Sequence, residues 1–201
     1  MGSSNPHPHG QVWYLNEIPT FPEIELANLK KYSQQLPQGI AAGPSCPKGP
    51  DNKPCLLCEY ANYELFVEKE ESRVVVHNED WVAVVPYWAV WPFELLGAFY
   101  FYGSALFSSG DSLVLPYRRH IPSLAHLNGQ ERTSLASIIR RVTIRYDNLF
   151  STSFAYSMGI HQRPTPGADP SVLTTGDEAH IHLHFNPPLV RSATVRKFLV
   201  G

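Results

Sequence analysis

The sequence predicts an α+β fold in which helices pack on a mainly antiparallel sheet. Two runs rich in β-branched residues, Arg73–His77 and Trp81–Pro86, are separated by Asn78-Glu79-Asp80, a pattern typical of a β-hairpin. An apolar stripe at helical spacing predicts one long helix over Asn128–Asn148. Hairpins combined with a long helix favour the α+β class.

The first part of the chain is predicted to hold a strand, two helices and a linker. Gln11–Leu15 is predicted as a strand. Pro22 stands where a helix would start, and apolar residues on one side predict that helix over Glu23–Gln35. Gln38–Pro54 is rich in Gly, Pro, Ser and Lys, and we expect a mobile linker there. A short helix is expected from Cys55 to Glu68.

Further strands are expected along the second part of the chain. Phe93–Leu96 and Leu113–Leu115 are short strand candidates, whereas the glycine-broken apolar stretch Gly97–Ser112 gives no clear pattern. Phe154–Met158 and His180–Phe185 are predicted as two more strands, joined by a polar loop that contains three prolines. The stripe of the long helix is interpreted as core packing, and it consists of Leu135, Ile138, Ile139, Val142, Tyr146 and Leu149.

Composition excludes several classes of protein. The 201 residues carry a formal net charge of −2 without a basic stripe, which argues against nucleic acid as a partner. The longest apolar run, around Leu95–Phe107, is broken by glycines and is too short to span a membrane. The polar, proline-rich N-terminus does not look like a signal peptide. Because three cysteines are not a disulfide framework, we expect a reducing, cytoplasmic location.

A histidine motif near the N-terminus, Asn5-Pro6-His7-Pro8-His9-Gly10-Gln11, is the first candidate for chemistry. Proline favours extended backbone, so residues two apart are expected on one face of a stiff segment. We therefore expect this stiff segment to hold the imidazole of His9 in a position where it can take part in chemistry. The alternative is a frayed, histidine-rich terminus without a function.

A second histidine motif lies in the predicted strand at His180–Phe185. Alternation predicts that His180, His182 and His184 share one face, where imidazoles could bind zinc or iron. His161 could join them from a neighbouring strand, and a carboxylate could come from Glu23–Glu25. The alternative is a row of histidines that simply faces solvent.

The pair Cys55-x-x-Cys58 is half of a possible zinc site. Cys46 is too loosely spaced to count as a third ligand. His120 or His126 could complete the site if the fold brings either of them near. The alternative is two ordinary buried thiols.

Several long segments closely resemble the galactose-1-phosphate uridylyltransferases, a branch of the histidine-triad superfamily. The resemblance covers nearly the whole chain except 38–54 and 97–112. The segments that carry it are Gly2-Ser-Ser-Asn-Pro-His-Pro-His-Gly-Gln-Val-Trp13, Trp81-Val-Ala-Val-Val-Pro-Tyr-Trp-Ala-Val-Trp-Pro-Phe-Glu94, Arg145-Tyr-Asp-Asn-Leu-Phe150, Tyr156-Ser-Met-Gly159, His182-x-His184-Phe-x-Pro-Pro188 and Arg191-Ser-Ala-Thr-Val-Arg-Lys-Phe198.

The resemblance implies transfer of uridylyl between UDP-glucose and galactose 1-phosphate, which yields glucose 1-phosphate and UDP-galactose. His9 matches the family's nucleophile, which forms a uridylyl-histidine intermediate. Gln11 matches the glutamine that donates to the phosphoryl oxygens. Gly2, Ser3 and Ser4 match the turn that holds the phosphates, although many members have cysteine in place of Ser3.

The resemblance also implies metal ligands and a partner subunit. His7 matches a ligand of the family's zinc site. A second, structural site of iron or zinc is matched by Glu25, His161, His182 and His184. Cys55 and Cys58 match a pair found in some relatives, an arrangement that would recruit His120. The resemblance implies a homodimer, in which the hexose end of the substrate in the partner subunit is met by Lys197, Phe198 and Val200.

The implied organisation is a C-terminal portion of the family pattern with a histidine-triad-like half-barrel. Residues 1–37 match the end of a first half-repeat, 38–54 a linker, and 55–201 a second half-repeat with an atypical insert at 97–112. Because the pattern's first half is not in this sequence, we expect weak or no transferase activity from the chain alone. Two alternatives stay open, namely an ADP-sugar phosphorylase or nucleotide hydrolase of the same superfamily, and a non-catalytic metal-stabilised module.

Overall fold

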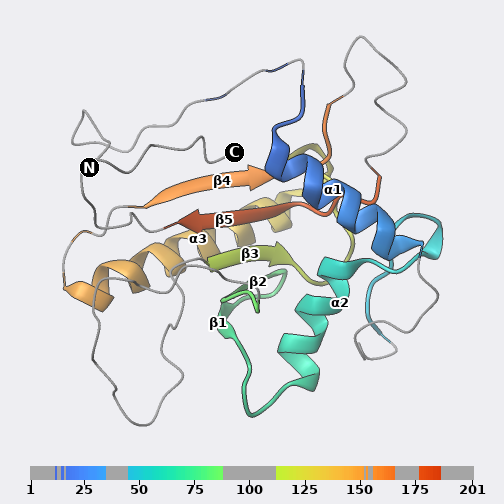
Figure 1. Ribbon diagram of the computed structural model, residues 1–201. Coiled ribbons are helices and arrows are strands. Elements are labelled where there is room, and N and C mark those ends of the chain that lie inside the picture. The colour runs from blue at the N-terminus through green and yellow to red at the C-terminus, as the bar shows by residue number, and fades with distance from the viewer. Residues whose placement is uncertain are drawn as a thin grey trace.

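The computed structural model describes residues 12, 15, 17–34, 45–87, 112–151, 153, 156–165 and 177–186. Within them, five strands form one antiparallel sheet in the order β1-β2-β3-β5-β4 (Figure 1). The strands are β1 Val74–His77, β2 Trp81–Val84, β3 Ser112–Pro116, β4 Ser157–His161 and β5 His182–Asn186. The helices are α1 Thr20–Ser33, α2 Leu56–Asn62 and α3 Gly129–Phe150. Shorter turns are Pro50–Asn52, Leu124–His126 and the π-helical turn Tyr63–Val67 that continues α2. The predicted α+β class with an antiparallel sheet is confirmed.

The long helix α3 covers one face of the sheet. Its N-terminus carries a capping box, in which the Asn128 side chain accepts from the backbone N–H of Glu131 and the Glu131 carboxylate accepts from the backbone N–H of Asn128. The Glu131 carboxylate also accepts from Arg119 Nε and Nη2 at 2.6 and 2.7 Å. The helix ends at Phe150 and is capped by Ser151, whose φ of 51° is left-handed. The predicted helix Asn128–Asn148 is therefore confirmed, with an end two residues later.

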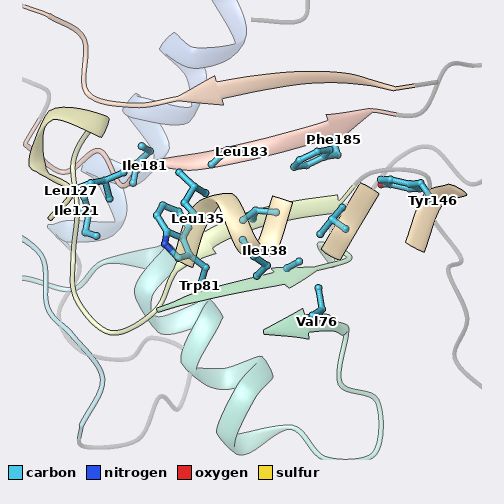
Figure 2. Packing of buried hydrophobic residues seen from close by; sticks show 13 residues of the cluster. Val76, Trp81, Ile121, Leu127, Leu135, Ile138, Tyr146, Ile181, Leu183 and Phe185 are labelled. Atoms are coloured by element: carbon cyan, nitrogen blue, oxygen red, sulfur yellow. The ribbon is translucent and has the colours of Figure 1, made fainter. Parts of the chain in front are cut away.

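The main core lies between α3 and the sheet. Trp81 is fully buried at its centre and points toward Leu135 and Ile138 of α3 (Figure 2). The Trp81 indole N–H donates to the Glu131 carbonyl at 2.9 Å, so the buried polar atom of this large side chain is satisfied. Phe185 of β5 is also completely buried in this core. Most of the apolar stripe predicted for this helix is therefore core, as expected.

A second core lies on the opposite face, under α1 and α2. Leu29 of α1 and Leu57, Tyr60 and Ala61 of α2 pack against Val82, Val84, Leu113 and Leu115 of the sheet. Both faces of β2 and β3 are therefore buried. The two helices that cover this face are also the elements that bring Glu25 and the Cys55–Cys58 pair toward the sheet.

Element boundaries differ from the predictions at several places. Helix α1 begins at Thr20, so Pro22 lies in its first turn, where the missing N–H of proline costs no hydrogen bond. Strand β4 begins three residues later than predicted and ends at His161. The predicted strands Gln11–Leu15 (except for residues 12 and 15) and Phe93–Leu96, and the stretch 97–111, lie outside the described residues.

The described part of the predicted linker, residues 45–54, contacts α2. Cys46 is buried beside Cys55 and Cys58, and Lys48 Nζ lies 3.3 Å from Glu59 Oε1. Asp51 and Asn52 have φ values of 53° and 58°, in the left-handed region that these residue types tolerate. No helix among the described residues is long and apolar enough to cross a membrane.

Candidate metal centres

The first cluster of possible ligands is formed by Glu25, His161, His182 and His184. Glu25 comes from α1, His161 from the edge strand β4, and the other two histidines from β5. His161 is paired with His182 across the two strands, and His184 is two residues further along β5 on the same face. One ligand atom from each residue lies within 4.8 Å of all the others. We call this group the carboxylate–histidine cluster.

The geometry of this cluster is that of a site able to hold a divalent ion. Glu25 Oε2 lies 2.6 Å from His161 Nδ1 and 3.6 Å from His182 Nε2, and Glu25 Oε1 lies 3.7 Å from His184 Nε2. A tetrahedral zinc ion with ligand bonds near 2.05 Å separates its ligand atoms by about 3.3 Å. The histidine distances to Glu25 bracket that value. His182 donates its Nδ1–H to the carbonyl of His180 at 2.7 Å, so Nε2 is the nitrogen that faces Glu25.

His184 gives a second indication that the cluster binds a ligand. Its Nε2 atom is buried and has no hydrogen-bond partner among the described residues. A buried polar nitrogen without a partner is costly, since it loses water and gains nothing. Burial, together with the neighbouring His182 and His161, lowers the pKa of His184 to about 3. The ring is therefore neutral at pH 7, the form that coordinates a metal.

The carboxylate of Glu25 supplies the negative charge of the cluster. Burial raises its pKa, but hydrogen bonds from His161 and His182 together hold the pKa well below the usual value for glutamate. One anionic and three imidazole ligands form a mixed N/O donor set, which suits zinc and iron. The residues present therefore fit a metal ion.

The second cluster of possible ligands is formed by Cys55, Cys58, His120 and His180. Cys55 precedes α2 and Cys58 lies in its first turn, so both thiols point from the same end of the helix. His120 follows β3, and His180 comes two residues before β5. Their ligand atoms also lie within 4.8 Å of one another, and all but His120 are buried. We call this group the thiol–histidine cluster.

Backbone carbonyls orient both histidines of this cluster. His120 Nε2–H donates to the Asp177 carbonyl at 3.2 Å, and Nδ1 faces Cys55 Sγ at 3.4 Å. His180 Nε2–H donates to the Pro116 carbonyl at 3.0 Å, while its Nδ1 accepts from the Ile121 N–H at 3.1 Å. A carbonyl on one ring nitrogen is the usual partner of a histidine that binds metal through the other.

The pKa values of the two thiols are shifted in opposite directions. A hydrogen bond from the Cys58 thiol lowers the pKa of Cys55, against the effect of burial. The same bond, together with burial, raises the pKa of Cys58. Burial lowers the pKa of His180 to about 4, so its ring is neutral. For tetrahedral zinc, sulfur and nitrogen ligands are separated by about 3.6 Å. The observed sulfur–nitrogen distances of 3.4 Å for Cys55–His120 and 4.0 Å for Cys58–His180 bracket this value.

The expectation that His180, His182 and His184 share one face is wrong for His180. Strand β5 begins only at His182, because the Ile181 N–H donates to the Ile121 carbonyl at 2.7 Å, outside the sheet ladder. Two-residue alternation holds only inside a strand, so His180 turns toward the cysteines. His180 was therefore missed as a partner of Cys55. The position of His180 next to the histidine strand in the sequence does not indicate a contact with the cysteines.

Other candidates fall inside and outside these clusters. His120 joins Cys55 and Cys58 as one alternative anticipated, whereas His126 contacts Ser123 Oγ at 2.8 Å instead. Cys46 is buried next to the two cysteines but does not belong to the four-residue group. The remaining predicted site residues lie outside the described residues, and they are Gly2, Ser3, Ser4, His7, His9, Gln11, Lys197, Phe198 and Val200.

Comparison with known proteins identifies relatives over the whole chain. The sequence is 45% identical over 201 residues to a galactose-1-phosphate uridylyltransferase of Cryptococcus neoformans, covering all of this chain and 43% of the relative. It is 41% identical over 204 residues to that of Saccharomyces cerevisiae, covering all of this chain and 44% of the relative. The chain therefore spans less than half the length of these relatives.

Solved structures show a similar fold. A structure described as a uridylyltransferase has a TM-score of 0.60 at 24% identity, covering 92% of this chain and 44% of the other. An ADP-glucose phosphorylase from Arabidopsis thaliana has a TM-score of 0.58 at 17% identity, covering 89% and 42% of the two chains. At these identities the likeness concerns the fold alone.

A family model described as "Galactose-1-phosphate uridyl transferase, C-terminal domain" matches residues 25–98 and 110–201. The match contains all eight residues of the two clusters. The resemblance seen in the sequence is thus confirmed, and the chain belongs to the galactose-1-phosphate uridylyltransferase family, of which it carries the C-terminal domain.

Proposed function

We propose that this chain forms the C-terminal part of a galactose-1-phosphate uridylyltransferase that uses His9 as its nucleophile. The observation that carries this proposal is an identity of 38–45% over the whole chain to several curated proteins of that name. The motif His7-Pro8-His9-Gly10-Gln11 supplies the residue types that the reaction needs. The proposed substrates are UDP-glucose or UDP-galactose and the matching hexose 1-phosphate.

In the proposed reaction, an unprotonated ring nitrogen of His9 attacks the α-phosphorus of UDP-glucose. The bond between this phosphorus and the bridging oxygen breaks, and glucose 1-phosphate leaves. A phosphate oxygen of galactose 1-phosphate then attacks the uridylyl-histidine, which forms UDP-galactose and returns His9. Imidazole suits both steps, because it is largely neutral at pH 7 and serves as nucleophile and leaving group. The Gln11 amide donates to the phosphoryl oxygens as negative charge develops on them.

We assign the remaining predicted site residues by the same resemblance. Gly2, Ser3 and Ser4 hold the phosphates, and His7 is a metal ligand. Lys197, Phe198 and Val200 contact the hexose of a substrate bound in the partner subunit of a homodimer. The protein is proposed to be cytoplasmic, where the three cysteines stay reduced.

We assign a structural metal ion to each of the two clusters. The thiol–histidine cluster is proposed to hold zinc, because thiolate and imidazole are its common structural ligands. The carboxylate–histidine cluster is proposed to hold zinc or iron. Support comes from the ligand distances, from the buried Nε2 of His184 and from the carbonyls that orient His120, His180 and His182. The ions would fix the ends of the strands and helices, as structural metal sites do.

The test uses UDP-glucose labelled on its α-phosphate. The chain is assayed alone and in a chimera, in which it replaces the matching residues of the Cryptococcus neoformans relative. We expect stoichiometric label on His9 in the chimera and little in the chain alone, and we expect His9→Asn to abolish the label. A folded, metal-loaded chimera without label on His9 would overturn the proposal in favour of a metal-stabilised module. Faster labelling by ADP-glucose would instead favour a phosphorylase.

A further inference from the structure

The two clusters meet at one short segment, His180-Ile181-His182. His180 belongs to the thiol–histidine cluster and His182 to the carboxylate–histidine cluster. The Nδ1–H of His182 donates to the backbone carbonyl of His180 at 2.7 Å, and both side chains are buried. Resting on the metal sites proposed above, we propose that the two clusters bind their ions cooperatively, each loaded site raising the affinity of the other.

The first step of the argument concerns the position of His180 before an ion binds. Cys58 Sγ lies 4.0 Å from both ring nitrogens of His180, so it is not aligned with either one. The Nδ1 lone pair accepts from the Ile121 N–H at 3.1 Å instead. Coordination through Nδ1 requires about 3.6 Å to the sulfur, so the ring of His180 must move by a few tenths of an ångström and Nδ1 must give up its hydrogen bond from Ile121.

The second step follows this shift into the other cluster. The carbonyl of His180 holds the Nδ1–H of His182, and this bond decides which nitrogen of His182 faces Glu25 and at what angle. An ion that fixes His180 therefore also fixes the orientation of His182. When a ligand side chain is already ordered, less conformational entropy is lost as the second ion binds. Such coupling between two sites is reciprocal by thermodynamic necessity.

The covering helices provide a second connection between the clusters. Glu25 lies on α1, and Cys58 lies on α2 next to Glu59. Tyr32 of α1 donates its hydroxyl to Glu59 Oε2 at 2.5 Å. Leu29 of α1 also packs in the core that contains Leu57 of α2. Drawing α2 toward a metal ion thus steadies the helix that presents Glu25.

Charge does not oppose this coupling. Two thiolates neutralise a divalent ion, so a loaded thiol–histidine cluster has no net charge and does not repel a second cation. The carboxylate–histidine cluster carries one carboxylate and three neutral imidazoles, so its loaded form has a net charge of +1. The sign of the coupling is therefore set by ordering, and it is positive.

Cobalt(II) is the probe, because a thiolate ligand gives it a charge-transfer absorption that carboxylate and imidazole ligands do not. The chain is first loaded with one equivalent of zinc at the thiol–histidine cluster. Cobalt is then titrated into the carboxylate–histidine cluster, where only ligand-field bands appear. We expect the Cys58→Ser variant to bind this second ion at least fivefold more weakly, the lower end of about 5–150-fold for coupled sites. Cys46→Ser is the matched control and keeps the affinity of the original chain.

The reverse titration decides the question if Cys58→Ser does not fold. His184→Ala removes a ligand whose Nε2 has no other partner among the described residues. In the His184→Ala variant, the thiol–histidine cluster should bind cobalt at least fivefold more weakly than in the original chain. The affinity is measured from the charge-transfer band. Tyr32→Phe, with all ligands kept, should reduce the factor. Equal affinities within twofold in both directions overturn the coupling while leaving the metal sites in place. If neither cluster of the original chain binds cobalt, the metal assignment itself fails and the coupling with it.

Discussion

Glu131 connects the capping box of α3 to Arg119, the residue before the candidate ligand His120, and we predict that Glu131→Ala destabilises the fold by about 2 kcal/mol. The substitution removes the capping acceptor for the Asn128 N–H, a loss of about 1 kcal/mol. It also removes a two-pronged pair with Arg119, which is 45% exposed and therefore contributes about 1 kcal/mol after screening by solvent. The negative charge at the helix N-terminus adds about 0.5 kcal/mol, and the better helix propensity of alanine offsets a similar amount.

The same prediction has a definite dependence on pH. The hydrogen bond from Arg119 lowers the pKa of Glu131 in the folded protein, against the effect of burial. A carboxyl group with a lowered folded pKa stabilises the fold above its unfolded pKa, and this contribution is lost as the pH falls through the folded value. The difference in stability between the original chain and the variant should therefore be constant from pH 8 to about 5.5 and should shrink below about pH 4.5.

Urea unfolding followed by far-ultraviolet circular dichroism at pH 7.5 and at pH 3.5 measures both effects on the metal-free chain. Gln130→Ala is the matched control, because Gln130 is the neighbouring residue and its side chain makes long, partly exposed hydrogen bonds to Glu79 and Asp80, at 3.3 and 3.5 Å. It should cost about 0.5 kcal/mol or less. A loss below about 0.5 kcal/mol for Glu131→Ala, or a larger loss at pH 3.5 than at pH 7.5, would refute the reasoning.

Three further predictions concern the core and one ligand. Phe185→Ala, in a fully buried position, should lower the free energy of unfolding by about 3–5 kcal/mol in urea, whereas Met158→Ala, 40% exposed on the edge strand, should cost about 1 kcal/mol or less. Trp81→Phe should cost about 2 kcal/mol in the same assay, because the Glu131 carbonyl loses its buried donor; a cost below about 0.5 kcal/mol would contradict this. Because the pKa of Cys58 is raised, zinc binding must displace the proton of this thiol. Calorimetry in two buffers should therefore show proton release and a zinc affinity that increases with pH. Zinc binding without proton release would exclude Cys58 as a ligand.

The elements that the sequence predicts best are those specified by local patterns. The stripe Leu135–Tyr146 and the cap at Asn128 define α3 within one segment, and the strands Val74–His77 and Trp81–Val84 are joined by a tight turn. Such elements need no knowledge of distant residues. Where the boundary of an element depends on tertiary hydrogen bonds, as at the start of β4, the local pattern misplaces that boundary by a few residues.

The candidate sites were predictable only in part for the same reason. Spacing alone gives the Cys55–Cys58 pair and the alternation of His182 with His184. That His120 and His180 complete the first pair depends on two chain segments meeting, through the Ile181 N–H on the Ile121 carbonyl. Residue chemistry alone suggested His161 and a carboxylate from Glu23–Glu25 as partners of the histidine strand. The specific assignment of Glu25 came from the family resemblance, since a helix and a distant strand share no local pattern.

Helix α1 connects the carboxylate–histidine cluster to the reaction that is proposed for His9. Its apolar attachment to the sheet is small, because Leu29 and Ser33 are its buried residues, while Phe21 and Ile24 are 70% and 52% exposed. Toward its N-terminal end, the contact with the sheet is made by the carboxylate of Glu25 against three histidines. Metal binding to such ligands adds directly to the free energy that holds the element in place. An ion at Glu25 would thus secure the helix that follows the segment of His9 in the sequence.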